Sequence, residues 1–167
     1  MTQASQIRTV EQLYAHAIAI EREAAARYAE LGERMSDLGN DLVGELFLRP
    51  AQMEKEHQQV LERRADGLKL PGVERSEFAW LGGAGPETAA HDLVFSVLTP
   101  HSALELALGA EERAAQFFES ARLQIADPSV ASLAAEMAVE EGVHIAWVKS
   151  ALRRTPNPVI DWNAVFS

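Results

Sequence analysis

The chain has 167 residues, a formal net charge of -10 and no cysteine. This length suits one domain with a substantial hydrophobic core. The negative charge argues against binding to nucleic acid or to an anionic membrane surface, and no apolar stretch is long enough to span a membrane. The lack of cysteine excludes disulfides, thiolate zinc sites and cysteine-ligated iron centres. The first ten residues contain no apolar signal core, so we expect a cytoplasmic protein.

The first predicted helix runs from about Val10 to Leu38. Thr9 and Gln12 have the spacing of a capping box, and Gly39 is a typical stop signal. Apolar residues recur on one face with helical spacing, and one member of this stripe is charged. The stripe consists of Leu13, Tyr14, Ala17, Glu21, Ala24, Tyr28 and Leu31.

The second predicted helix starts near Asn40 and ends near Gly67. Pro50 lies in its interior, where it removes one backbone hydrogen bond and crowds the carbonyl of Leu46. We therefore expect a kink one turn before Glu54, with a complete break as the alternative. The inward stripe consists of Val43, Phe47, Glu54, His57 and either Val60 or Leu61.

Residues 67–99 are punctuated by glycine and proline, and a short helix is expected over Glu87–Val97. A connection of this length inside a bundle usually crosses from one end to the other. We therefore expect the second and third main helices to be parallel. The short loops elsewhere predict that helices 1 and 2 are antiparallel, as are helices 3 and 4.

Two Pro-containing caps define the last two helices. Thr99 and Pro100 begin the third helix, while Asp127 and Pro128 end it and begin the fourth. The third stripe consists of Leu104, Ala107, Leu108, Glu111, Ala114 and Phe118. The fourth stripe consists of Val130, Leu133, Met137, Glu141, His144, Val148 and Leu152. The tail over 156–167 is expected to pack on the bundle or on a neighbouring subunit.

The charged members of these stripes repeat in the order Glu, Glu-x-x-His, Glu, Glu-x-x-His. They are Glu21, Glu54, His57, Glu111, Glu141 and His144. Residues three apart on a helix share a face, so each Glu-x-x-His directs a carboxylate and an imidazole to one place. Burying four carboxylates and two imidazoles is unfavourable unless cations compensate them. Two divalent ions would do so, and the sequence predicts a dinuclear metal site on the axis of a pseudo-twofold bundle.

The donor set suits iron or manganese, with mixed occupancy as a further option, because it is rich in oxygen and offers one imidazole per metal. Open coordination positions would allow redox chemistry with oxygen or peroxide. Glu140 competes with Glu141, since it stands four residues before His144, although periodicity favours Glu141. Tyr28 either serves the site, by bonding a ligand carboxylate or carrying an electron, or is an ordinary packed aromatic. His91 and His101 are expected to be solvated.

The motifs resemble those of the ferritin-like superfamily, and most closely the rubrerythrin-type di-iron proteins. The resemblance spans about residues 10–152. It rests on Glu21-x6-Tyr28, Glu54-Lys55-Glu56-His57, Glu111-x6-Phe118 and Glu141-Gly142-Val143-His144. It implies an all-α chain in which residues 1–167 form a single ferritin-like four-helix bundle with a long crossover between helices 2 and 3. It also implies that the six charged stripe residues bind two iron ions.

By the same resemblance, the chain is expected to be an oxidoreductase that acts on hydrogen peroxide or dioxygen. Rubrerythrins often carry a rubredoxin-like domain with cysteine-bound iron, and they often have a glutamate where this chain has Ala114. Without cysteine, this chain would need a separate electron-donor protein or reductant. The alternatives are a ferritin-type iron-storage protein, a manganese catalase-like enzyme and a metal-free helical interaction module. We expect a homodimer or a higher homo-oligomer.

Overall fold

The computed structural model describes residues 7–73 and 99–157. Four α-helices make up most of these residues: α1 (Val10–Asp37), α2 (Asp41–Arg64), α4 (Pro100–Gln124) and α5 (Pro128–Arg154). The helix predicted over 87–97 and nearly all of the C-terminal tail lie outside the described residues. The described part contains no strand, which confirms the all-α prediction.

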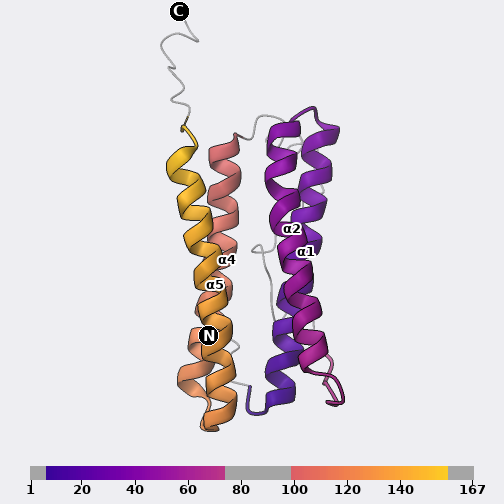
Figure 1. Cartoon of the computed structure of the whole chain (residues 1–167), viewed down its shortest axis with the longest axis vertical. Helices are drawn as coiled ribbons and strands as arrows, with labels where there is room; N and C mark the ends of the chain where they lie inside the picture. The colour runs from indigo at the N-terminus through magenta and orange to yellow at the C-terminus, as the bar shows by residue number, and fades with distance from the viewer. Residues whose placement is uncertain (1–6, 74–98, 158–167) are drawn as a thin grey trace, which may run out of the picture.

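The four helices form two antiparallel hairpins, α1 with α2 and α4 with α5, as Figure 1 shows. Helices α2 and α4 run in the same direction, so the predicted parallel relation across the long crossover is confirmed. Packing is most extensive within each hairpin, and the hairpins meet through α2–α4 and α1–α5 contacts. The result is a four-helix bundle of the predicted topology. None of these helices is long and apolar enough to cross a membrane.

Side-chain caps begin three of the helices, as their sequences predict. The Thr9 hydroxyl accepts a hydrogen bond from the Gln12 amide, and the Gln12 side chain accepts one from the Thr9 amide, each at 3.2 Å. Thr99 accepts from the Ser102 amide at 3.1 Å. Asp127 caps α5 in the same way. These bonds satisfy amides that the helix itself leaves without acceptors.

Glycines with positive φ lie just beyond the ends of the first hairpin's helices. Gly39 has a φ of 77° after α1, in the left-handed region that glycine adopts without strain. Gly67 has a φ of 81°, and α2 ends at Arg64, three residues before the predicted bound. Helix α2 continues through Pro50, so the alternative of a complete break is wrong.

Two hydrophobic clusters form the core, one on each side of the polar stripe residues. The first contains Leu13, Leu61, Phe118 and Met137 among others, and the second contains Tyr28, Met35, Phe47 and Val148 among others. In every helix, the charged stripe residues fall between the positions that enter the two clusters. Leu61 is buried and Val60 is exposed, so Leu61 and not Val60 continues the inward stripe of α2.

His101 does not lie in solvent as predicted. It is only partly exposed, and its Nδ1 atom lies 3.0 Å from the carbonyl oxygen of Thr155. Thr155 follows α5, and His101 is in the first turn of α4. The antiparallel α4–α5 hairpin therefore brings together two residues that are far apart in the sequence.

Candidate metal centre

The six charged stripe residues meet in the middle of the bundle, each projected inward from a different turn of the four helices. Five of them are at most 5% exposed: Glu21, Glu54, Glu111, Glu141 and His144. His57 is partly buried. Helical periodicity explains this placement, because each residue continues a stripe whose neighbours one turn away are core apolar residues.

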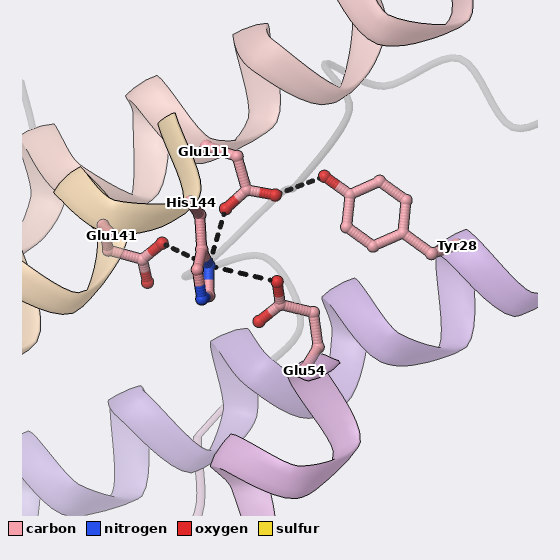
Figure 2. A network of polar contacts seen from close by, with 5 residues as sticks. All are labelled: Tyr28, Glu54, Glu111, Glu141 and His144. Carbon is pink, nitrogen blue, oxygen red and sulfur yellow. Dashed lines mark hydrogen bonds and ion pairs between the residues drawn. The ribbon is translucent and has the colours of Figure 1, made fainter. Parts of the chain in front are cut away.

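His144 lies at the centre of the cluster, as Figure 2 shows. Its Nδ1 atom is 3.2 Å from a carboxylate oxygen of Glu54 and 3.2 Å from one of Glu111. A carboxylate oxygen of Glu141 lies 3.7 Å away. Since Glu54 belongs to α2 and the other residues belong to α4 and α5, this contact joins the two hairpins.

His57 stacks on His144 with a ring-centroid separation of 4.7 Å. Its Nδ1 atom is buried and has no hydrogen-bond partner. A buried polar nitrogen without a partner is costly, so a group that supplies one would stabilise this arrangement. An imidazole nitrogen is also a common metal ligand.

The donor atoms form two overlapping groups, Glu54–His57–His144 and Glu111–Glu141–His144. In each group they lie within 4.8 Å of one another. No other set of three such side chains comes this close in the ranges 7–73 and 99–157.

Glu21 lies beside the first donor group and makes a side-chain hydrogen bond to Glu54. Burial raises the pKa of Glu21 well above its usual value, and this bond and the charge of Glu54 add to the effect. The raised pKa favours a protonated Glu21 carboxyl, which donates the proton of this bond to Glu54. The structure thus gathers all six predicted residues, with Glu21 attached to the others through Glu54.

The pKa values of Glu141, His144 and Glu54 are shifted in different directions. Burial raises the pKa of Glu141 to about 9, helped by the charges of Glu111 and Glu54. Burial opposes protonation of His144, but hydrogen bonds to Glu111 and Glu54 raise its pKa to about 10. Burial would also raise the pKa of Glu54, yet hydrogen bonds with His144 and Glu21 lower it. In the metal-free cluster, protons thus provide the compensation that cations would otherwise supply.

Tyr28 extends the cluster on the α1 side. Its hydroxyl donates a hydrogen bond to Glu111 at 2.5 Å (Figure 2). Its ring stacks on Phe47. The side chain is fully buried. Burial and the charge of Glu111 raise the pKa of Tyr28 well above its usual value, so the hydroxyl remains a donor. This contact supports a tyrosine that orients a candidate ligand carboxylate.

The structure places one residue pair that the sequence left open, and it shows one difference that the sequence does not predict. Glu140 is only partly buried and belongs to neither donor group, so the structure places Glu141 and not Glu140 in the cluster. The sequence treats the two Glu-x-x-His pairs as equivalent, but His144 contacts three carboxylates whereas His57 has an unpaired nitrogen. No sequence signal distinguishes these two histidines.

The residues fit a dinuclear metal site. Four carboxylates and two imidazoles offer hard oxygen and borderline nitrogen donors, the set that iron and manganese prefer. Metal ions would replace the protons on Glu21, Glu141 and His144, and could supply the partner that His57 lacks.

Comparisons with known proteins agree with the fold and the cluster. A family model described as Rubrerythrin matches residues 13–78, a segment that contains Glu21, Glu54 and His57. The crystal structure of an uncharacterized conserved protein from Magnetospirillum magnetotacticum MS-1 is 31% identical to this chain, with a TM-score of 0.75. The similarity covers 91% of this chain and 99% of that one. None of the curated proteins matches significantly.

Proposed function

Because the chain belongs to the rubrerythrin-type proteins of the ferritin-like superfamily, we propose that it binds two iron ions and acts as an oxidoreductase on hydrogen peroxide or dioxygen. The buried cluster of carboxylates and imidazoles at the centre of the bundle carries this proposal. A bundle that had no use for metal would gain stability from apolar residues at these positions.

The proposed ligands are Glu21, Glu54, His57, Glu111, Glu141 and His144. Two divalent ions would balance the four carboxylates once the protons have left, and each ion would have one imidazole available. Such ions, when bound, supply one-electron redox steps to peroxide or dioxygen. The bundle's own contribution is to hold the ligands in place and to keep the site largely shielded from water.

The side chains around the ligands set their orientation. Tyr28 holds one oxygen of Glu111 through its hydroxyl proton, while the other oxygen faces Nδ1 of His144. This pair of contacts fixes the plane of the Glu111 carboxylate. Neighbours that orient a ligand typically strengthen metal affinity, because the ligand then loses less freedom on binding.

Electrons would have to come from outside the chain. The sequence contains no cysteine, so no thiolate-bound iron can relay electrons within it. A separate electron-donor protein or small reductant is therefore part of the proposal. So is a cytoplasmic location, where reducing systems are abundant.

Manganese is the competing metal, since the oxygen-rich donor set accepts it equally well. A manganese catalase-like protein would consume peroxide without an added reductant. A ferritin-type storage protein would instead assemble into a closed cage and retain far more iron than the ligands can hold. Peroxide decay with and without reductant, together with the assembly mass, separates these alternatives.

The test is to load the purified chain with ferrous iron, count the bound metal and follow peroxide consumption in the presence of a reductant. We expect two irons per chain and peroxide loss that the metal-free protein does not catalyse. Glu141→Gln should lower the metal content and abolish the activity, whereas the adjacent Glu140→Gln should retain both. Equal behaviour of these two variants would contradict the ligand assignment.

A further inference from the structure

The outward face of α5 is unusual among the helices because its exposed central residues carry no charge. These residues are Val139, Gly142, Val143 and Ala146. Val139 is 69% exposed and Val143 is 62% exposed. A side chain added at Gly142 would meet nothing within 4 Å. A helix face directed to solvent is normally polar, so this apolar face points to a contact with another surface.

The outward face of α1 provides the contrast. Its exposed positions include Arg22, Glu30 and Glu33, which are charged and suited to water. The apolar face of α5 also lies opposite Glu141 and His144 on the same helix, both of which point into the bundle. Neither the metal cluster nor packing among residues 7–73 and 99–157 explains the composition of this face.

We propose that this face binds a second copy of this chain through an antiparallel, twofold α5–α5 contact. If the twofold axis passes between Gly142 and Val143, Gly142 of one copy lies opposite Val143 of the second copy. By symmetry, Val143 lies opposite Gly142 of the second copy. Val139 would then lie opposite Ala146 of the second copy. The face is thus self-complementary, as an isologous interface requires, and its small residues permit close approach of the two helices.

The charges that flank the face favour the same arrangement. Glu136 and Lys149 are equally far from the axis, so Glu136 stands at the same height as Lys149 of the second copy. Both side chains remain about half exposed beyond their contacts with Arg64 and Glu112 within the chain. Antiparallel pairing would place opposite charges at both edges, whereas parallel pairing would place like charges together. This pattern favours a second copy over an unrelated partner.

The first test is sedimentation equilibrium of the full chain, with and without ferrous iron. We expect twice the 18.3 kDa chain mass under both conditions, because no proposed metal ligand lies on this face. Val143→Glu places a carboxylate at the centre of the contact and should weaken the dimer at least tenfold. Leu42→Glu is the matched control, because Leu42 on α2 is 65% exposed and the charge change is the same. It should remain dimeric.

The second test uses the absence of cysteine from the chain. Val143→Cys introduces a single thiol beside the proposed axis, so mild oxidation should rapidly give a disulfide-linked dimer. Leu42→Cys should cross-link much more slowly. Glu136→Lys should weaken the dimer, and the double variant with Lys149→Glu should restore it even though the contacts to Arg64 and Glu112 remain lost.

Three results would overturn the proposal. They are a monomeric wild-type chain, an assembly that Val143→Glu leaves intact, and cross-linking of Val143→Cys no faster than that of Leu42→Cys. Circular dichroism of each variant ensures that a loss of assembly is not a loss of fold. Loss of metal binding with the dimer preserved would count against the proposed function alone, so the two proposals fail separately.

Discussion

At the scale of single residues, Tyr28 is the neighbour of the cluster whose role is easiest to isolate. Its hydroxyl donates to Glu111, and its ring packs within the core beside Phe47. Tyr28→Phe removes the donor and keeps the ring. We expect ferrous iron to bind roughly tenfold more weakly, because a proposed ligand loses the group that orients it. Isothermal titration with ferrous iron under nitrogen measures the change.

Tyr14 supplies the matched control for this experiment. It is the other tyrosine of the chain, and it is buried on the same helix but packs in the first hydrophobic cluster. Tyr14→Phe should leave iron affinity unchanged. If the two variants bind iron alike, Tyr28 is an ordinary packed aromatic and not a positioning residue.

Single residues also show which contacts helical periodicity can predict and which it cannot. Periodicity favours Glu141 over its neighbour Glu140, and the structure places only Glu141 in the cluster. This prediction succeeds because one step along a helix turns a side chain by about 100°, which separates adjacent residues clearly. His101 is the opposite case. Its partner is the carbonyl of Thr155, and local pattern cannot reveal a contact made by the other end of a hairpin.

At the scale of helices, Thr99 illustrates how a cap supports an element that carries a proposed ligand. Its hydroxyl accepts from the Ser102 amide at the start of α4, the helix that contains Glu111. Thr99→Ala should reduce the free energy of unfolding by about 1 kcal/mol. The corresponding drop in melting temperature is about 3 °C for a chain of this size.

Thermal melts followed by circular dichroism test this prediction. Thr99→Ser keeps the hydroxyl acceptor and should melt close to the wild-type temperature. Iron content should be unchanged in both variants, because the cap is several turns from Glu111. An equal drop for alanine and serine would show that the methyl group, and not the cap, stabilises α4.

Helix bounds were predictable wherever the signal is local. The capping box at Thr9 and the Pro-containing caps before α4 and α5 were predicted and are present. The end of α2 was predicted less well, because no residue between Arg64 and Gly67 is a strong stop signal. From the sequence, Pro50 was compatible with either a kink or a complete break in α2. Packing of α2 against α1 compensates for the bond that proline removes, and the helix continues.

At the scale of the whole molecule, the protonated cluster makes the metal-free protein sensitive to pH. The pKa of Glu141 is raised from 4.5 to about 9, that of Glu21 is raised as well, and that of His144 is raised from 6.5 to about 10. The folded chain therefore holds more protons than the unfolded chain across this window. Its stability must fall as pH rises from about 5 to about 9.

Melts of chelator-treated protein at pH 5, 7 and 9 measure this effect. We expect the melting temperature to fall by about 5 °C or more over the range. Glu54 has a lowered pKa, so its ionised form stabilises the folded chain. This contribution is lost only as the pH falls into the acidic range, below the range of these melts. Glu141→Gln should flatten the slope, since amide and protonated carboxyl resemble each other. A melting temperature that rises towards pH 9 would contradict the proton distribution described here.

The architecture of the whole bundle was predictable because its signals repeat. Four amphipathic stripes, two short loops and one long crossover predict the antiparallel hairpins and the parallel α2–α4 relation. The repeat also suggests a symmetric cluster. The structure is less symmetric, with His144 among three carboxylates and His57 without a partner at Nδ1. Such differences depend on rotamers and helix offsets, which a sequence pattern does not specify.

We propose above all that the four acids and two histidines at the centre of the bundle hold two metal ions. Anomalous X-ray scattering from iron-loaded crystals, recorded on both sides of the iron and manganese edges, tests it most directly. We expect two anomalous peaks among Glu21, Glu54, His57, Glu111, Glu141 and His144, with the iron-edge signal present. Crystals soaked in ferrous iron that show no peak there, with the carboxylates still hydrogen-bonded to His144, would contradict it.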